Sequence, residues 1–169
     1  GSILTPPVIA DGTIYVGTDS ATLYAIEAET ATQSWTVDTE EPMTAPPLVT
    51  DNTIYIGTDQ LYQVDPDRGD RTVFVESDAP IQTTPKLVGE RLYLGDTSGR
   101  LSAIDTVTGD LLWNRSVRED ALVSPLYHEG LLYTGSIGVP LTIVDAQDGD
   151  LVAESDVLGG ETVILMDGY

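Results

Sequence analysis

Four copies of one sequence block, spaced about 40 residues apart, constrain the fold of this chain more than any other feature. The copies read PPVIADGTIYVGTD from residue 6, PPLVTDNTIYIGTD from 46, TPKLVGERLYLGDT from 84 and SPLYHEGLLYTGSI from 124. Their tyrosines, Tyr15, Tyr55, Tyr93 and Tyr133, are 40, 38 and 40 residues apart. A second block follows each copy and reads LYAIE, LYQVD, LSAID or LTIVD. Repeats of this length are typical of propellers, solenoids and repeat arrays.

The alternation of side chains within each block indicates β-strands. In TIYVG, TIYIG, RLYLG and LLYTG every second residue shares a face, and both faces are apolar, as in strands buried on two sides. Residues 21–32 offer a rival interpretation, because they lack Gly and Pro and are rich in Ala and Glu, which favour a helix. The equivalent segments DPDRGD, DTVTGD and DAQDGD are turn sequences, so we expect a turn there too.

Each repeat therefore predicts four short strands, A to D, with strand D around Trp35, Val73, Trp113 and Ala153. Short A–B turns such as ADG and TDN imply antiparallel pairing. We predict an all-β fold, a β-propeller or part of one, with four four-stranded antiparallel blades. The expected repeats are 6–45, 46–84, 85–124 and 125–162, with residues 163–169 opening a fifth.

Charge and cysteine content exclude several functions. The chain has 28 acidic and 7 basic residues in 169, a formal charge of −21, which argues against binding nucleic acid or anionic membranes directly. With no cysteine, disulfides, thiolate metal sites and cysteine nucleophiles are excluded for this chain. An apolar fraction of 41% is sufficient for a buried core.

The segment from Leu101 to Trp113 resembles the repeat of pyrroloquinoline-quinone-like (PQQ-like) propellers, whose pattern is roughly Ala-x-Asp-x-x-Thr-Gly-x-x-x-Trp. The match runs through Ala103, Asp105, Thr108, Gly109 and Trp113. The first repeat keeps the Trp but has Glu27 and Ala31 in place of Asp and Gly, and the second and fourth repeats lack the Trp. The family contains quinoprotein dehydrogenases and non-catalytic scaffolds such as outer-membrane assembly lipoproteins.

For quinoprotein enzymes, the resemblance implies a quinone held by a Trp and a vicinal Cys pair, together with Ca²⁺ and an Asp base. The Cys pair does not exist here. The resemblance also implies that Trp35 and Trp113, which occupy equivalent positions, dock one blade on the next. We therefore expect no cofactor and no enzymatic activity, and keep a fragment of a PQQ-dependent dehydrogenase as the alternative.

Other catalytic and metal-binding patterns are weak, and we assign no catalytic or metal-ligating residue. His128 is the only histidine and lies in a predicted turn, where a solvated side chain is the usual outcome. Asp65, Asp67 and Asp70 with Glu76 partly match a calcium loop, but Gly69 falls one position early. Asp and Gly are also the expected residues of a tight turn, which is the interpretation we favour.

The loops suggest where a partner binds. In antiparallel blades the B–C and D–A loops share one rim, and these loops differ most between repeats. Variable loops on a repeated scaffold commonly carry recognition. We therefore predict a binding or scaffolding propeller for protein partners, and its candidate rim residues are Asp19, Asp59, Asp96, Arg100 and Arg118.

Two further expectations concern assembly and location. Related propellers have six to eight blades, so the chain is expected to be part of a ring, and a second copy is a possible partner in a homodimer that completes it. The family resemblance favours the cell envelope or an extracellular location over the cytoplasm. An extracellular sensor domain of a larger protein is a further alternative.

The charge pattern indicates adaptation to high salt. The acidic residues number 7, 7, 6 and 8 in residues 1–45, 46–84, 85–124 and 125–169, Asp outnumbers Glu by 18 to 10, and Lys86 is the single lysine. An even layer of carboxylates is typical of halophilic proteins, so we expect a halophilic, archaeal source. The net charges of these four segments are −7, −5, −1 and −8, and the nearly neutral third repeat is where we would look first for a contact.

Overall fold

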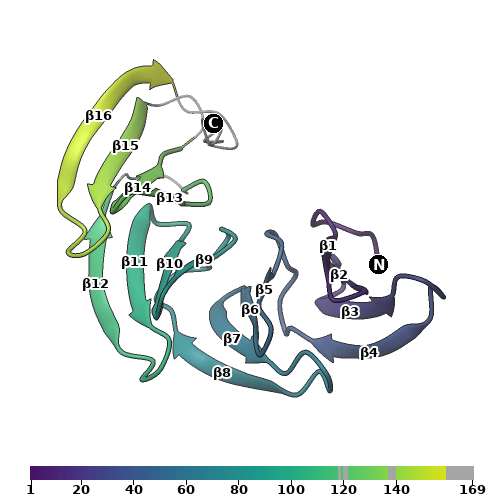
Figure 1. The fold of residues 1–169 in the computed structure, drawn as a ribbon. Helices are drawn as coiled ribbons and strands as arrows, with labels where there is room; N and C mark the ends of the chain where they lie inside the picture. Colours follow the sequence, from purple (N-terminus) through teal and green to yellow (C-terminus); the bar gives the residue numbers. More distant parts are fainter. Residues whose placement is uncertain (118, 120–121, 137–139, 159–169) are drawn as a thin grey trace. The chain divides into compact units, whose positions relative to one another are not determined.

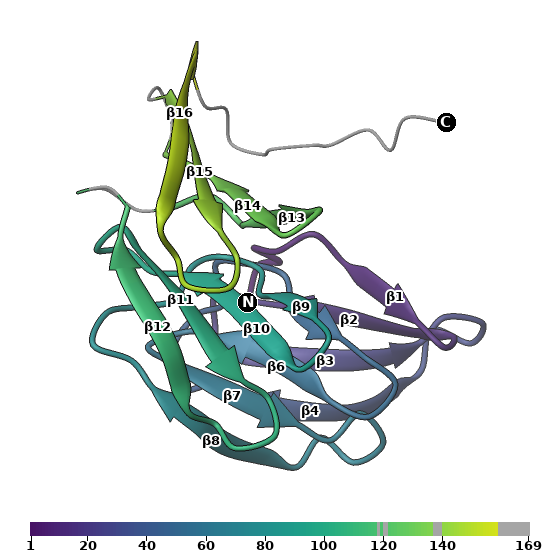
Figure 2. The same cartoon turned by 60° about the vertical axis from the view of Figure 1, so that its left-hand side comes forward.

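The computed structural model describes residues 1–117, 119, 122–136 and 140–158, and all regular structure in this part of the chain is β. It contains four sheets of four antiparallel strands, each with its strands in chain order (Figures 1 and 2). The all-β prediction with four such blades is confirmed. Residues 163–169, predicted to open a fifth repeat, and Arg118 lie outside the described residues.

The sixteen strands follow the repeats. Sheet 1 consists of β1 Val8–Ala10, β2 Thr13–Gly17, β3 Thr22–Glu27 and β4 Gln33–Asp38. Sheet 2 consists of β5 Leu48–Val49, β6 Ile54–Gly57, β7 Gln60–Val64 and β8 Arg71–Glu76. Sheet 3 consists of β9 Lys86–Val88, β10 Arg91–Gly95, β11 Arg100–Asp105 and β12 Leu111–Ser116. Sheet 4 consists of β13 Leu126–His128, β14 Leu131–Thr134, β15 Pro140–Asp145 and β16 Leu151–Leu158.

Equivalent residues pair in the same register. Tyr15 of β2 lies opposite Ala25 of β3, and Tyr93 of β10 lies opposite Ala103 of β11. The segment with helical propensity, residues 21–32, forms β3 and the turn that follows it, with Ala31 at a φ of 54°. Strand pairing on both sides therefore overrides the local preference for a helix.

The chain divides into two compact units, Gly1–Thr84 and Pro85–Tyr169, each with two sheets. In the first unit, Leu23 and Ala25 of β3 pack with Ile56 of β6 and with Tyr62 and Val64 of β7. In the second unit, the buried cluster joins sheet 3 to sheet 4 and comprises Tyr93, Leu101, Ala103, Trp113, Leu122, Leu132, Val144 and Ala146. Within each unit, the space between two adjacent sheets is the hydrophobic core.

Two loop contacts fix the ends of sheets 1 and 2. The Ile81 N–H donates to the Thr58 carbonyl, and the Thr39 N–H donates to the Ala21 carbonyl at 2.8 Å. In each pair a D–A loop bonds to a B–C loop, so these two kinds of loop lie at the same end of the sheets. Among the described residues, none forms a helix with the length and apolar character needed to cross a membrane.

Candidate functional site

The loops around Asp59 form a hollowed surface on the predicted rim. Two cavities of about 430 and 440 Å³ adjoin there, and both are lined by Asp59 and Pro80. We call this pair the Asp59 hollow. Its other lining residues are Glu41, Pro42, Thr44, Thr58, Gln60, Glu76, Ser77, Asp78, Ala79, Ile81 and Gln82.

The Asp59 hollow is built by loops that differ from their equivalents in other repeats. Asp59 belongs to the B–C turn that is two residues shorter than the others, and its carboxylate accepts a bond of 3.0 Å from the Thr58 hydroxyl. The wall from Ser77 to Gln82 is the D–A loop, anchored by Ile81, which is 2% exposed. The lining includes four carboxylates and no basic side chain, so its electrostatic field favours a positively charged partner segment.

Asp19 and Asp96 have other roles in the loops where they lie. The Asp19 carboxylate is exposed and accepts a bond of 2.7 Å from the Ser2 N–H, which ties the first residues to the B–C turn of sheet 1. Asp96 is 6% exposed, and its Oδ1 accepts bonds from the Ser98 N–H, the Ser98 hydroxyl and the Arg100 N–H. A carboxylate turned inward by three donors of its own loop organises that loop.

Arg100 is exposed at the start of β11. The structure therefore places Asp59 in a hollow, Asp19 and Arg100 on the surface and Asp96 in the interior. Arg118 lies outside the described residues.

The two tryptophans lie between sheets. The Trp35 Nε1–H donates to the Pro66 carbonyl of sheet 2 at 2.9 Å, and the Trp113 Nε1–H donates to the Ala146 carbonyl of sheet 4 at 3.2 Å. Each indole also lies 5.9 Å from a tyrosine ring of its own sheet, Tyr15 or Tyr93, centre to centre. Both indoles are thus occupied by contacts between neighbouring sheets.

A glycine of the next sheet faces each indole. Gly69 and Gly149 have φ values of +73° and +76°, and a Cβ on either would lie within 3 Å of the Trp35 or Trp113 ring. Glycine is required there for two reasons, the left-handed backbone and the close approach of the indole. A quinone site would need one of these rings together with a Cys pair, and the residues of this chain do not fit that cofactor.

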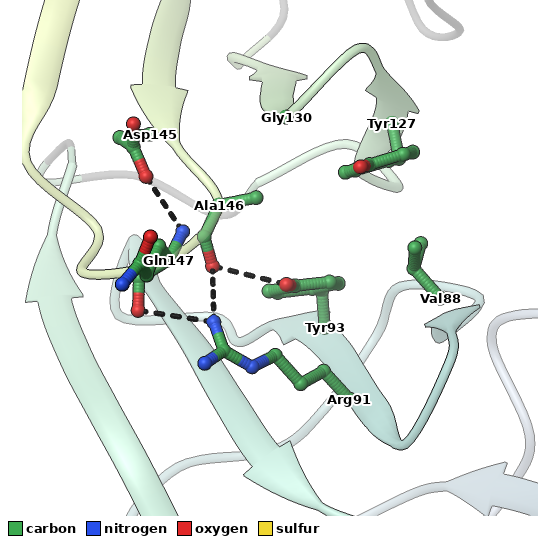
Figure 3. Close-up of a pocket in the computed structure, with 8 residues that line it drawn as sticks. All are labelled: Val88, Arg91, Tyr93, Tyr127, Gly130, Asp145, Ala146 and Gln147. Atoms are coloured by element: carbon green, nitrogen blue, oxygen red, sulfur yellow. Dashed lines mark hydrogen bonds between the residues drawn. The ribbon is translucent and has the colours of Figure 1, made fainter.

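A second pocket, of about 370 Å³, lies between the A–B and C–D turns of sheets 3 and 4 (Figure 3). Its polar groups bond to one another: the Ala146 carbonyl accepts from the Tyr93 hydroxyl at 3.0 Å and from Arg91 Nη1 at 3.4 Å. The same Arg91 nitrogen donates to the Gln147 carbonyl at 3.2 Å. Burial raises the pKa of Tyr93 above its usual value of 10.0, so the phenol remains a neutral donor.

Arg91 is not among the residues predicted from the sequence, although its position in the repeat distinguishes it. The positions equivalent to Arg91 hold Thr13, Thr53 and Leu131, so Arg91 departs from the repeat. Its guanidinium donates to two carbonyls of the neighbouring turn, and Arg91 therefore joins sheet 3 to sheet 4. The pocket in Figure 3 therefore has few groups left for a ligand, and the Asp59 hollow is the better candidate.

In the acidic turns, an aspartate carboxylate accepts hydrogen bonds from backbone N–H groups of the same turn. Asp65 Oδ1 accepts from the Asp67 and Arg68 N–H groups at 2.8 and 3.0 Å. Asp105 makes the equivalent bonds to Val107 and Thr108, and those N–H donors lower the pKa of Asp105 below its usual 3.8. The segment that partly matched a calcium loop thus has the same turn geometry as a repeat without the acidic cluster.

Known proteins resemble this chain over most of its length. A family model described as "Outer membrane protein assembly factor BamB" matches residues 1–121 and, in a second overlapping match, residues 52–163. The outer membrane protein assembly factor BamB of Moranella endobia strain PCIT is 26% identical over 167 residues, which cover 88% of this chain and 42% of that protein. The chain thus spans less than half the length of this curated relative.

Solved structures share the fold. The crystal structure of BamB from Moraxella catarrhalis superposes with a TM-score of 0.75 at 24% identity, covering 90% of this chain and 49% of that one. The quinohemoprotein alcohol dehydrogenase of Comamonas testosteroni gives a TM-score of 0.74 at 15% identity, covering 95% and 36% of the two chains. At these identities the likeness shows a common fold.

Proposed function

The chain belongs to the PQQ-like repeat family described as outer membrane protein assembly factor BamB, and we propose that it is a non-catalytic scaffold that binds other proteins through the Asp59 hollow. One observation carries this proposal. The loops that vary between repeats meet around a double cavity in sheets 1 and 2, whereas the uniform turns are occupied by bonds within and between sheets. Recognition by variable loops on a rigid sheet scaffold is common.

The lining of the Asp59 hollow suggests the chemistry of the partner. Glu41, Asp59, Glu76 and Asp78 surround a wall formed by Pro42, Pro80 and Ile81. Such a surface suits an extended segment with basic side chains and a short apolar stretch. Charges at the edge of an interface mainly raise the association rate and select against acidic competitors.

The names of the relatives suggest a setting for this binding. Proteins of similar sequence are called outer membrane protein assembly factors. We propose that this chain acts in the cell envelope or outside the cell, on proteins that are being assembled there. A second copy of the chain remains a proposed partner, and the acidic composition supports a role in a high-salt environment.

Charge reversal at one residue tests the proposal. Asp59→Arg is expected to reduce capture of the principal partner from a cell-envelope extract by about tenfold, equivalent to about 1.4 kcal/mol. Captured proteins are quantified by mass spectrometry against the unmodified chain. Asp51→Arg is the matched control, since Asp51 is an exposed aspartate in the A–B turn of the same sheet.

Two results would refute the proposal. One is an unchanged set of captured proteins with Asp59→Arg. The other is an equal loss with Asp51→Arg, which would show that the overall charge, and not the Asp59 hollow, determines binding. Circular dichroism of both variants establishes that they remain folded.

A further inference from the structure

Two adjoining cavities make up the Asp59 hollow, and they differ in chemistry. Pro42, Pro80 and Ile81 supply apolar surface to the cavity of about 440 Å³, which also has the carboxylates of Glu41 and Asp59 in its lining. The cavity of about 430 Å³ is mainly polar, and its lining residues are Asp59, Gln60, Glu76, Ser77, Asp78, Ala79 and Pro80. We call the first the proline cavity and the second the acidic cavity. They share Asp59 and Pro80.

The two prolines of the proline cavity occupy equivalent positions in the D–A loops of sheets 1 and 2. Pro42 precedes the buried Met43, and Pro80 precedes the buried Ile81. Both prolines are exposed. The corresponding segment of the third repeat, 117–123, contains no proline. Because the pyrrolidine ring is rigid, this pair of exposed prolines offers a preformed apolar surface to a partner side chain.

Hydrogen bonds within the two D–A loops hold the walls of both cavities. In the loop of sheet 1, the Thr39 hydroxyl donates to the Glu41 carbonyl at 2.8 Å. In the loop of sheet 2, the Ser77 hydroxyl donates to the Ala79 carbonyl at 2.7 Å. Loops that are already ordered lose little conformational entropy when a partner binds, so even a short segment of a partner can be recognised.

The acidic cavity favours a cation from a partner. Its lining residues include three carboxylates and no Lys, Arg or His. Arg71 lies in β8 together with Glu76, but its Nη2 binds Glu40 Oε1 at 2.6 Å and its guanidinium carbon lies 4.5 Å from the centre of the Tyr62 ring. The charge of Arg71 is thus balanced by Glu40, which does not line the hollow. A basic side chain of a partner is attracted by the field of the acidic cavity.

We propose that the Asp59 hollow recognises an extended protein segment in which an apolar residue and a basic residue are two positions apart. The apolar side chain enters the proline cavity, and the basic side chain enters the acidic cavity. Residues i and i+2 of an extended chain point to the same side, about 7 Å apart, which suits two cavities that share lining residues. This inference rests on the proposed function, because it specifies the partner of the same surface.

Capped five-residue peptides test this motif by calorimetric titration of the purified chain, at the lowest KCl concentration at which circular dichroism shows it folded. For Ser-Leu-Ser-Arg-Ser we expect a dissociation constant on the order of 1 mM. Ser-Leu-Ser-Ser-Ser and Ser-Ser-Ser-Arg-Ser, with one of the two side chains each, are expected to bind about fivefold more weakly. In Ser-Leu-Arg-Ser-Ser the two side chains point to opposite sides of an extended chain, so most of the gain should be lost.

Substitutions in the chain assign each side chain of the peptide to its cavity. Glu76→Gln removes one carboxylate of the acidic cavity and should weaken Ser-Leu-Ser-Arg-Ser about threefold, without changing the binding of Ser-Leu-Ser-Ser-Ser. Asp51→Asn removes one exposed carboxylate from the A–B turn of the same sheet, so it is the matched control and should change neither. Pro42→Ser should weaken both peptides that contain leucine and leave Ser-Ser-Ser-Arg-Ser unchanged.

NMR spectra of the unmodified chain locate the peptides without any substitution. Thr44 lines the proline cavity and Gln60 the acidic cavity, so leucine should shift the amide of Thr44 and arginine that of Gln60. The inference is overturned if Ser-Leu-Ser-Arg-Ser binds no more tightly than Ser-Ser-Ser-Arg-Ser, if Ser-Leu-Arg-Ser-Ser binds equally well, or if neither amide shifts. Failure of the proposed function is a different result, in which a photoreactive residue at Gln60 captures no protein.

Discussion

At the scale of single residues, folding makes three tyrosines harder to ionise. The pKa values of Tyr15, Tyr62 and Tyr93 are raised above the usual 10.0, in each case chiefly by burial, which penalises the phenolate. The Tyr93 hydroxyl also donates to the Ala146 carbonyl, a bond that requires the proton. The neutral phenol is therefore part of the packing between sheets.

These shifts predict loss of stability in alkali. Below pH 10 the tyrosines are protonated in both states, and their contribution to folding is fully present. As the pH rises above 10, the unfolded state ionises first and is stabilised, so the free energy of unfolding falls until the folded-state pKa values are passed. Urea unfolding between pH 8 and 11, with absorbance at 295 nm to follow phenolate formation, measures this effect.

Tyr93→Phe is the control for the alkaline effect. Ala146 retains its bonds from Trp113 and Arg91, so the substitution is expected to cost only about 1 kcal/mol at pH 8. The decline in stability above pH 10 should become shallower. A decline of unchanged slope in Tyr93→Phe would show that this phenol does not contribute to it.

At the scale of the element, contacts between an indole and a turn join neighbouring sheets. Trp35 meets the turn at Gly69, and Trp113 meets the turn at Gly149. The tryptophan of each contact could be recognised in the sequence, because the two tryptophans occupy equivalent positions in their repeats. The tryptophan-to-glycine contact itself needed the structure, since the partners are more than 30 residues apart.

Gly149→Ala should separate the effect of this contact from backbone strain. Gly130 has a similar φ of +84° with nothing near its missing Cβ, so Gly130→Ala is the matched control and should cost about 1 kcal/mol. Gly149→Ala adds a collision with the Trp113 ring and should cost about 2–4 kcal/mol. The measurement is urea unfolding. Equal losses for the two variants would contradict a close indole contact.

The strands were predictable and the hollowed surfaces were not. Period-2 alternation and turn residues located the strands, and comparison of all four repeats corrected the helical propensity of residues 21–32. The Asp59 hollow depends on how two D–A loops fold back, which no local pattern encodes. The inward orientation of Asp96 could not be predicted either. The same loop sequence allows the carboxylate to face solvent or to accept bonds from its own loop.

At the scale of the whole molecule, the charge of −21 is the dominant property. Carboxylates spread evenly over four repeats repel one another at low ionic strength, which destabilises the compact state. Salt at about 1 M shortens the Debye length to about 3 Å and removes most of this repulsion. We therefore expect the folded chain to be less stable in dilute buffer than in concentrated salt.

The salt dependence is a direct prediction. The melting temperature is expected to rise by about 10 °C between dilute buffer and 2 M KCl, because the salt screens a repulsion of a few kcal/mol. Circular dichroism at several KCl concentrations measures it. An unchanged melting temperature would show that the acidic layer is not an adaptation to salt.

We propose above that the variable loops at the Asp59 hollow bind a protein partner. A photoreactive phenylalanine at Gln60, which lines the hollow, tests it most directly when compared with the same residue at Asn52, in the A–B turn of the same sheet. On irradiation in cell-envelope extract, we expect a discrete protein adduct from position 60 and none from position 52. Adducts of equal yield from both positions, or from position 52 alone, would contradict it.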